Sequence, residues 1–532
     1  MLRLHQVHRP FDERLSNPWR QSDYYQLARN FDREGLDPRY PRIDWRGDGP
    51  GFAEMELPVL PWLGAVSHRL LGGPRVVWLR LWSAGFEILA WLLFVGLARR
   101  LLDPDATRGA VALFAVAPLP IELAGSLQPE PLVHALGLTA VLALARFHRG
   151  RRPRDLLWAA VALGLAIAAK LPAAHLGFLF AGVVLVVYGS RAVLRPVVWL
   201  AAWLALAPGA AWSLWARQFW LDYGYSLGVS NESHFLGLDL LWPPEFLVGL
   251  AKREVLVAIT PLALPLLAVA GWCLLRSILR RDGVPPGGEP GEAGESADGD
   301  RPRGLIFIAG WWGAAWLFYL LTARTSADGW AYYYHLYSVA PVCLLSGIGF
   351  STLRRWPWAW ARPLASGLLV LALLGASWVA WGQVRKPSHD VYLATLHGCA
   401  LELSESIPEE GRIVVRGGAM FDDGGRPVAH NESMVFAWID RKGFCYGDEA
   451  LSIDTLEELA TRGGRYWLVG AVELERAAIS DEVEARYRRL GTCTRSPYHL
   501  YDLAAPAPDR RPSITDSATP AGRSTTSVPE IR

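Results

Sequence analysis

The chain has 532 residues, of which 52% are hydrophobic and only 20% are charged, and it carries 25 tryptophans. Its charged residues separate apolar runs of roughly 18 or more residues, a length that spans a bilayer and that water-soluble domains do not repeat. The formal net charge of +2 is close to neutral, so no nucleic-acid partner is expected. The five cysteines form no CxxC or Cys/His cluster, which argues against a zinc site or a redox motif. The sequence therefore predicts an α-helical polytopic membrane protein.

Residues 1–75 are predicted to form an outward-facing first loop with interfacial helices. One such helix is expected at Leu57–Leu70, where leucines are mixed with polar residues. The segment Trp19–Phe31, WRQSDYYQLARNF, predicts another helix and contains the candidate carboxylate Asp23. Two interpretations of Asp23 remain open. With Gln26 it forms a candidate capping box for that helix, or it is a reactive acid, and it can do both only if its second oxygen faces a cleft.

About ten transmembrane helices are predicted over residues 76–384 from the apolar runs. The expected spans are Val76–Leu97, Gly109–Ala124, Pro131–Ala145, Leu156–Ala169, Pro172–Tyr188, Pro196–Ala216, Val255–Leu279, Gly304–Thr322, Tyr334–Leu353 and Pro363–Trp381. The stretch Leu156–Tyr188 has a second interpretation, because only Lys170 and Leu171 separate its two apolar halves. It is either two spans or one unit that is broken or re-entrant.

The arginines orient these spans. Loops and span ends on one side hold several arginines each, such as Arg99, Arg100 and Arg108, whereas those on the other side hold few. Cytoplasmic loops are the ones that carry positive charge. The segments expected to face outward are residues 1–75, Gln128–Glu130, Arg217–Glu254, Ala323–Tyr333 and everything after Gln383. The chain is thus expected to be a multi-pass protein of the inner (plasma) membrane with its C-terminal domain outside.

Residues 385–505 alternate strand-like and helix-like patterns, which predicts a small extracytoplasmic α/β domain. The strand-like segments are RIVVRG, RYWLVG and YHLYDL, and the helix-like ones are SIDTLEELATR and ELERAAISDEVEARYRRL. The Gly-, Pro- and Glu-rich loop Asp282–Asp300 and the tail 506–532 are predicted to be disordered. Three cysteines lie on the oxidising side, where one disulfide would leave one free thiol. They are Cys399, Cys445 and Cys493.

Several ionisable residues near the membrane face are candidates for chemistry. Glu130 lies in the outward hairpin SLQPEPL, where flanking prolines hold it at the membrane face, and the alternative is a solvated turn acid. Lys170 is either a snorkelling interfacial lysine or a ligand for a lipid phosphate. Glu56, where the first loop returns to the membrane, is a further candidate for substrate binding.

The outward turn RTSADGWAYYYHLYSVAP supplies Arg324, Tyr333 and His335 as substrate-binding candidates. An interfacial aromatic belt explains the tyrosines, whereas arginine and histidine beside them also suit a phosphate. Glu87 is embedded in an apolar stretch and is a functional candidate for that reason, although pairing with Arg80 would also explain it.

Taken in chain order, WRQSDYYQLARNF, ELPVLPWLGAVSHRLLGG, QPEPL, KLPA and YYYHLYSVAP resemble bacterial membrane glycosyltransferases of the C superfamily (GT-C). The likeness is greatest to glycosyltransferase family 39, the protein mannosyltransferase and aminoarabinose transferase-like group. It covers roughly residues 10 to 385. The resemblance implies an enzyme that transfers a sugar from a polyprenyl-phosphate carrier to an acceptor on the outer side of the membrane.

The resemblance also implies roles for single residues. Asp23 would be the first-loop acid and act as base on the acceptor hydroxyl, and Glu130 would be the acid of the second outward loop. The candidates for the carrier phosphate are Lys170, Arg324 and His335. A single displacement would invert the anomeric centre. Some members of the superfamily use a divalent metal; the sequence offers no clear ligand cluster, so the metal is left open and no other cofactor is expected.

The sequence departs from the family pattern in two ways. The second-loop acid is Glu130, where the family more usually has Asp. The family also places a transmembrane helix before the first loop, whereas here only about twenty residues precede Asp23. This departure predicts that the natural product begins earlier, with one more span.

Two other functions remain open. One is a membrane transporter or lipid flippase without transferase activity, against which stands the lack of an inverted internal repeat. The other is a non-catalytic envelope protein whose outward domain binds a partner. The sequence does not name the sugar or the acceptor.

Overall fold

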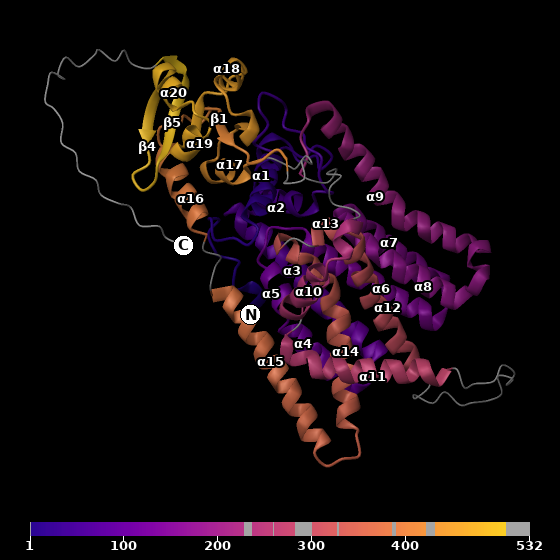
Figure 1. Cartoon of the computed structure of the whole chain (residues 1–532). Coiled ribbons are helices and arrows are strands. Elements are labelled where there is room, and N and C mark those ends of the chain that lie inside the picture. The colour runs from indigo at the N-terminus through magenta and orange to yellow at the C-terminus, as the bar shows by residue number, and fades with distance from the viewer. Residues whose placement is uncertain are drawn as a thin grey trace, which may run out of the picture.

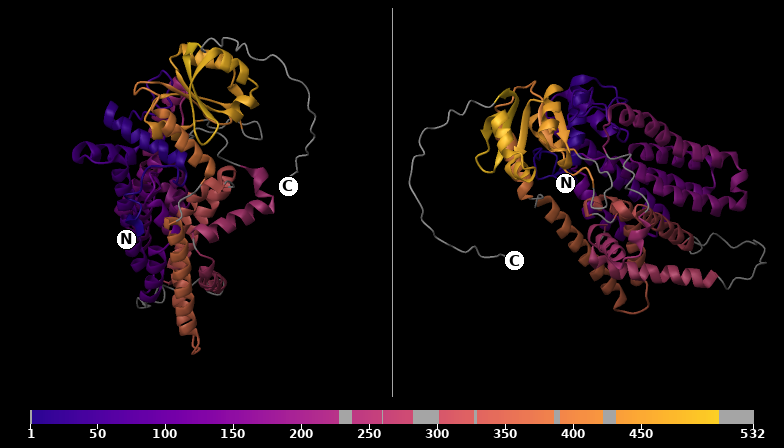
Figure 2. Two further views of the ribbon diagram at one scale, coloured as in Figure 1. Left: turned by 90° about the vertical axis from the view of Figure 1, so that its left-hand side faces the viewer. Right: turned by 45° about the horizontal axis from the view of Figure 1, so that its top comes forward.

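A computed structural model describes residues 2–227, 237–258, 260–281, 301–326, 329–385, 390–421 and 431–506. Long helices form the larger part of the molecule, and a small sheet domain covers one end of the bundle (Figure 1). Two other views show α1 and α2 of the first loop between that domain and the bundle (Figure 2). The predicted loop Asp282–Asp300 and residues 507–532 of the predicted tail lie outside the described residues.

The helices of the first loop and the bundle differ widely in length. They are α1 (Pro18–Glu34), α2 (Val59–Leu71), α3 (Arg75–Leu101), α4 (Pro104–Ala115), α5 (Pro118–Leu123), α6 (Glu130–Gly150), α7 (Pro153–Ala169), α8 (Leu176–Tyr188), α9 (Pro196–Tyr223), α10 (Pro244–Arg253), α11 (Leu264–Arg281), α12 (Arg301–Leu321), α13 (Ala323–Ser326), α14 (Leu336–Arg354) and α15 (Ala361–Arg385). Short 3₁₀ or π segments connect them, namely η1 (Leu2–Leu4), η2 (Leu171–His175), η3 (Gly189–Leu194), η5 (Leu238–Leu241), η6 (Glu254–Ala258), η7 (Pro261–Ala263) and η8 (Gly329–His335).

Eight helical segments of the described chain are long and apolar enough to cross a membrane, in agreement with the predicted polytopic fold. Two of the ten predicted spans are not among them. The apolar run Gly109–Ala124 is divided between α4 and α5, because Pro118 lacks a backbone N–H and opens a new helix. The run Leu156–Ala169 lies in α7, which has 17 residues and contacts α6 and α9.

The segment Leu156–Tyr188 is broken into two helices. The first, α7, ends at Ala169, Lys170 has an extended backbone, and the chain continues through η2 into α8. Gly164 lets α7 approach α9 closely, since a Cβ there would lie 2.3 Å from the Leu204 carbonyl oxygen. Small residues at such crossings permit close backbone packing in membranes. The break after α7 fixes the position of Lys170.

The first loop contains both predicted helices, but the capping prediction for Asp23 is wrong. The residue that precedes α1 is Asn17, and Asp23 lies inside the helix, in its second turn. The hydrophobic face of α1 packs against α2 and the C-terminal domain. The interfacial helix expected at Leu57–Leu70 corresponds to α2.

The C-terminal domain has the predicted α/β character, with a five-stranded sheet in the order β2-β1-β3-β5-β4. The strands β1, β2 and β3 are parallel, and β5 pairs antiparallel with β3 and β4. The elements are α16 (Val391–Ser404), β1 (Ile413–Arg416), α17 (Ser433–Ile439), β2 (Gly443–Tyr446), α18 (Ile453–Thr461), β3 (Tyr466–Gly470), α19 (Ala471–Arg476), α20 (Ser480–Arg486), β4 (Tyr487–Thr492) and β5 (Tyr498–Pro506). The segment expected as a single helix, ELERAAISDEVEARYRRL, instead forms α19, α20 and the start of β4.

The sheet domain and the first loop share one hydrophobic core. It joins Leu27 and Phe31 of α1 to Val435 and Phe436 of α17 and to Leu468 of β3. A disulfide between Cys399 and Cys493 ties α16 to the segment after β4, and Cys445 stays a free thiol, as the one-disulfide prediction required. The domain is therefore fixed to the first loop by core packing.

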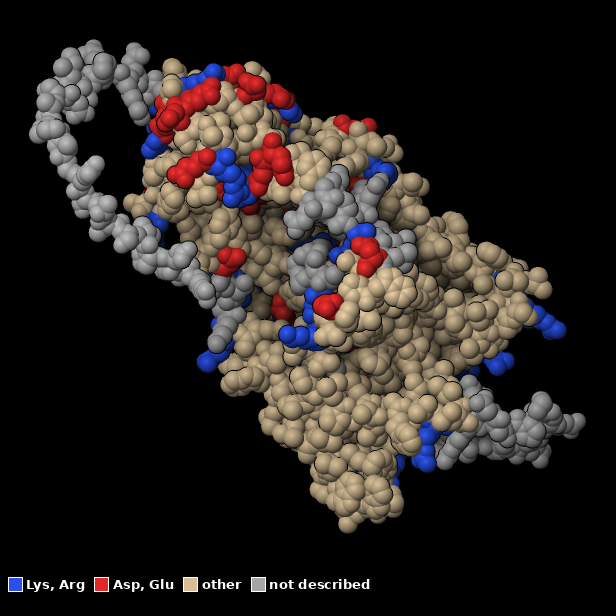
Figure 3. All heavy atoms as spheres, viewed as in Figure 1, with Lys and Arg blue, Asp and Glu red and all other residues tan. Residues whose placement is uncertain are grey.

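Charged atoms are unevenly distributed over the surface. Lys, Arg, Asp and Glu gather on the C-terminal domain, whereas the helical body is largely free of them on the face that Figure 3 shows. At the end of the bundle away from that domain, the charged atoms visible are Lys and Arg. This distribution fits an apolar body that lies in a membrane, with a basic end opposite the C-terminal domain.

Candidate functional site

A cluster of charged and aromatic side chains lies where the first loop meets the membrane bundle. Arg20 of α1 donates from Nη2 to Glu56 Oε1 at 2.6 Å, and both side chains are 12% exposed. Burial alone would raise the pKa of Glu56, but Arg20 and Lys170 outweigh it and hold this pKa below its ordinary value. Glu56 is therefore an ionised carboxylate that pairs with Arg20.

Lys170 and Glu130 form a buried ion pair beside this first pair. Lys170 Nζ donates to Glu130 Oε1, and both side chains are almost fully buried. Nζ also lies 4.4 Å from the ring centroid of Tyr333 and 5.2 Å from that of Tyr334, both from η8. The interpretation of Lys170 as a snorkelling lysine is wrong, because its residue is only 1% exposed. The extended break after α7 and the start of α6 bring the two charges together.

Asp23 lies on the neighbouring face of α1, with none of its surface exposed. Its Oδ1 accepts from Trp45 Nε1 at 3.2 Å, and its Oδ2 has no hydrogen-bond partner among the described residues. Burial raises the pKa of Asp23 to about 8, although Trp45 and Arg20 act in the opposite direction. A carboxyl with this pKa is mostly protonated at neutral pH, and a substrate can reach it only when the side chains around it move.

Buried polar atoms without partners gather around these pairs. Within the described residues they include Asp23 Oδ2, the Tyr24 hydroxyl, Glu130 Oε2 and both amide atoms of Gln128. A buried polar group that lacks a partner costs about 1–3 kcal/mol. Several such groups in one place indicate a site that water or a ligand completes.

The structure brings together Glu56, Glu130, Lys170 and Tyr333, and leaves two predicted residues elsewhere. Arg324 pairs with Asp239 at 3.2 Å. His335, which follows the clustered tyrosines in the sequence, pairs with Glu254 instead.

The partner of His335 is Glu254 of η6, whose Oε2 lies 2.5 Å from His335 Nδ1. The suggested Glu87–Arg80 pair is wrong. His134 lies 3.0 Å from Glu87, and Arg80 donates to backbone carbonyls of the N-terminal segment. Each of these partners is distant in sequence.

Sequence reasoning missed Arg20, Tyr24 and Trp45. Arg20 and Tyr24 are four residues apart on α1, so helical spacing from Asp23 could have indicated that they lie on adjoining faces. No local pattern marks Trp45, which reaches Asp23 across the first loop.

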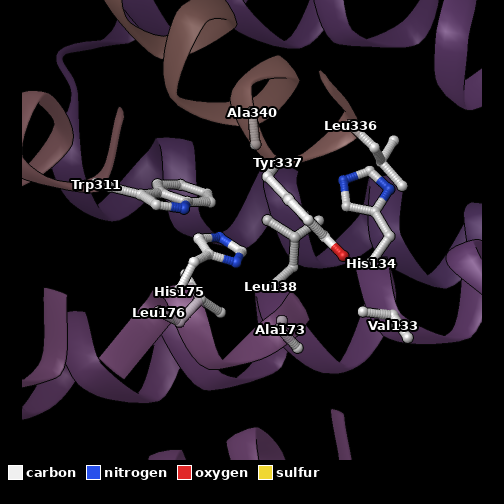
Figure 4. A pocket seen from close by; sticks show the side chains of 11 residues that line it. Val133, His134, Leu138, Ala173, His175, Leu176, Trp311, Leu336, Tyr337 and Ala340 are labelled. Atoms are coloured by element: carbon white, nitrogen blue, oxygen red, sulfur yellow. The ribbon is translucent and has the colours of Figure 1, made fainter. Parts of the chain in front are cut away.

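A cavity lies inside the bundle, lined by side chains of α6, η2, α8, α12 and α14 (Figure 4). Most of its lining is apolar, including Leu138, Leu176 and Trp311. His134 follows Glu130 by one turn of α6, and His175 ends η2; both line the cavity, and the Nε2 atoms of both have no hydrogen-bond partner in the described chain. The cavity thus combines apolar walls with a few polar atoms.

In the part of the chain that the structure describes, no group of three or more His, Cys, Asp or Glu side chains could hold a metal ion.

Comparison with known proteins supplies the wider context. Residues 50–215 match the family model described as dolichyl-phosphate-mannose-protein mannosyltransferase. No curated protein matches the chain by sequence. Among solved structures, ArnT from Cupriavidus metallidurans bound to undecaprenyl phosphate superposes with a TM-score of 0.57 at 13% identity, and the match covers 94% of this chain and 97% of that one. The chain has the GT-C fold.

Two other solved structures also match the fold of this chain. The oligosaccharyltransferase of Archaeoglobus fulgidus, tethered to an acceptor peptide, has a TM-score of 0.50 at 13% identity, over 91% of this chain and 69% of that chain. The mycobacterial arabinofuranosyltransferase AftD has a TM-score of 0.50 at 16% identity, over 95% of this chain and 41% of that chain. The fold that the sequence resemblance implied is confirmed: the chain is a multi-pass membrane protein with the GT-C fold and a small C-terminal sheet domain.

Proposed function

We propose that this GT-C protein is a glycosyltransferase that moves a sugar from a polyprenyl-phosphate carrier to an acceptor on the outer side of the membrane. The observation that carries the proposal is the buried polar cluster between the first loop and the bundle. It combines two cations, two ionised or paired acids and several polar atoms without partners.

The chemistry of sugar transfer matches these residue types. The oxygen of the acceptor hydroxyl attacks the anomeric carbon, the bond from that carbon to the phosphate oxygen breaks, and the phosphate leaves with the electron pair. Asp23 in its ionised form accepts the hydroxyl proton. Lys170 and Arg20 supply positive charge where negative charge develops on the phosphate. One displacement of this kind inverts the anomeric centre.

The partners of the two cations are part of the proposal. In the absence of donor, Glu130 and Glu56 neutralise Lys170 and Arg20. A phosphate that enters competes with these carboxylates for the same N–H donors. Because a buried charge without a partner is costly, the acids keep the empty site stable, and the phosphate replaces one anion by another.

The cavity beside Lys170 supports a lipid-linked donor. Its lining residues Val133 and Ala173 follow Glu130 and Lys170 by three residues each, and its walls are mostly apolar. Its volume of about 30 Å³ is that of a single water, so the first part of a polyprenyl chain enters only if these walls move apart. ArnT, which this chain resembles in fold, was solved with undecaprenyl phosphate bound.

The orientation in the membrane is also proposed. The disulfide Cys399–Cys493 belongs to a chain segment that folds in an oxidising compartment. The arginine-rich loops at the other end of the bundle favour the cytoplasm. Both features support a plasma-membrane protein whose reaction cluster and C-terminal domain face outward.

The test is turnover by purified protein in detergent or liposomes. The donors are undecaprenyl-phosphate-linked mannose, glucose, galactose and arabinose, and the measured product is free undecaprenyl phosphate, which both transfer and hydrolysis release. Release that is lost in Asp23→Asn supports the proposal. Transbilayer movement of the donor lipid without any release would instead identify a flippase and overturn it.

A further inference from the structure

The start of α17 lies directly over Asp23. Ser433 Oγ donates to the carbonyl oxygen of Trp19 at 2.6 Å, and Gln26 Nε2 donates to the Ser433 carbonyl oxygen. Trp19 and Gln26 flank Asp23 on α1, so both contacts hold the first turn of α17 against the part of α1 that carries the carboxyl. The C-terminal domain therefore forms one wall around Asp23.

Strong contacts between the two parts surround this wall. Arg33 of α1 donates to both oxygens of Asp440 at 2.8 and 2.7 Å, and Lys442 donates to Glu34 at 2.6 Å. Together with the shared hydrophobic core, these pairs keep α17 at a fixed position relative to α1. A fixed wall can hold an adjoining side chain in one orientation.

Four groups act on the Asp23 carboxyl from different elements. Trp45 of the first loop donates an N–H to Oδ1 at 3.2 Å. The Ser433 hydroxyl and the Arg20 guanidinium favour the ionised form, whereas Glu432, also from the domain, disfavours it.

Glu432 is held in place by its own contacts. Its side chain accepts from the Met434 N–H at 3.0 Å, and its backbone N–H donates to the Cys445 thiol of β2 at 3.3 Å. Burial raises the pKa of Glu432 to about 7 and keeps the Cys445 thiol protonated by raising its pKa strongly. The charged groups that face Asp23 are thus Arg20 from α1 and Glu432 from α17, with the neutral Cys445 from β2 nearby.

We propose that the C-terminal domain completes the reaction centre, with Glu432 and Ser433 of the domain and Trp45 of the first loop as positioning residues for Asp23. The inference rests on the proposed function, in which Asp23 receives the acceptor proton. Trp45 holds Oδ1, so the unpartnered Oδ2 is the oxygen that receives that proton. Burial keeps the carboxyl basic enough to take it, and the negative charge of Glu432 adds to this effect.

The polar neighbours and the acidic neighbour of Asp23 must shift the pKa of its carboxyl in opposite directions. Removal of a polar group that favours the carboxylate, as in Trp45→Phe or Ser433→Ala, makes the ionised form harder to reach. Removal of the neighbouring negative charge, as in Glu432→Gln, makes it easier to reach. A purely structural role would lower activity at all pH values without any shift of the pH profile.

The experiment measures kcat/KM for release of undecaprenyl phosphate between pH 5.5 and 9.5, with the donor of the four-sugar panel that the wild type turns over. The acid limb of the profile is expected to move up by about one pH unit in Trp45→Phe and Ser433→Ala, and down by a similar amount in Glu432→Gln. Two variants are matched controls. Trp438→Phe removes an indole on the same helix α17 whose N–H has no partner in the described chain, and Glu482→Gln removes a carboxylate on the distant helix α20. Both are expected to keep the wild-type limb.

The outcomes separate the inference from the proposed function. Undiminished release by Asp23→Asn overturns the base assignment and the inference with it. Loss of release in Asp23→Asn, with limbs in Ser433→Ala and Glu432→Gln that coincide with the wild type, overturns the inference alone. If Trp45→Phe fails to fold, as judged by size-exclusion chromatography, the opposite shifts of Ser433→Ala and Glu432→Gln decide the question.

Discussion

The pH dependence of Asp23 gives the sharpest prediction. A base acts only in its ionised form, and burial raises the pKa of Asp23 to about 8. At pH 7 about a tenth of the molecules therefore carry the ionised carboxylate, and at pH 8 about half do. We expect kcat/KM to rise about fivefold between pH 7 and pH 8 and to level off above pH 9. The measurement is release of undecaprenyl phosphate in a buffer series of constant ionic strength.

The Asn variant tests the same carboxyl in two ways. Loss of a general base lowers the rate by roughly 10²- to 10⁴-fold, and the residual activity of Asp23→Asn should no longer depend on pH through this range. Retained size-exclusion behaviour shows that the loss is chemical. A wild-type profile that is flat between pH 6 and pH 9 would refute the assignment of Asp23 as the base.

The stability of the fold should respond to pH with a definite sign. The pKa of Asp23 is about 8 in the folded protein and near its ordinary value of 3.8 when unfolded. The folded state then binds the proton more tightly, so its stability declines as the pH rises from about 4 to 8, by at most about 6 kcal/mol. Asp23→Asn carries no such charge, so it should be more thermostable than the wild type at pH 8 and differ little at pH 4. An equal pH dependence of the two melting temperatures would show that Asp23 titrates normally.

Three further predictions concern other parts of the molecule. Lys170→Ala should cost about 3–5 kcal/mol of stability because it leaves Glu130 charged and buried. A double variant in which Lys170 and Glu130 are replaced by Leu and Met should recover much of the melting temperature but not donor turnover. Equal stability of the single and double variants would show that the two residues are not coupled. Cys399→Ser should lower the free energy of unfolding by about 2–5 kcal/mol, and an unchanged melting temperature under oxidising conditions would argue that the disulfide does not form. A membrane-impermeant maleimide should label a cysteine placed at the exposed Glu475 in intact cells but not one placed at Gly150, and the reverse pattern would invert the proposed orientation.

The sequence by itself determined the fold class. Long apolar runs predict membrane helices because only a helix satisfies its own backbone hydrogen bonds in lipid. Alternating strand and helix patterns predicted β1, α18, β3 and β5 nearly at their observed bounds. These patterns depend only on neighbouring residues in the sequence, so they can be recognised without knowing which residues they contact in the fold. Their failure in the segment after β3 has a local cause as well, since a helical period can continue into a strand such as β4.

The cluster of charged and aromatic side chains between the first loop and the bundle was predictable only in part. Order along the chain, through the family resemblance, identified Glu130 and Lys170, but not that they pair with each other, 40 residues apart. The capping interpretation of Asp23 used spacing alone and was wrong, because α1 begins earlier, at Pro18. The sequence grouped His335 with the neighbouring tyrosines, whereas in the structure it pairs with Glu254.

Tertiary structure decided which charges face one another, because the free energy of a buried charge depends on its nearest partners in space. A sequence reports the residues of each helix, whereas the direction in which a side chain points depends on how that helix rotates and packs against others. The wall that α17 forms over Asp23 joins residues about 400 positions apart, as the Gln26–Ser433 contact does. Periodicity along a single segment carries no information about such a contact, and only the packing of the C-terminal domain onto α1 creates it.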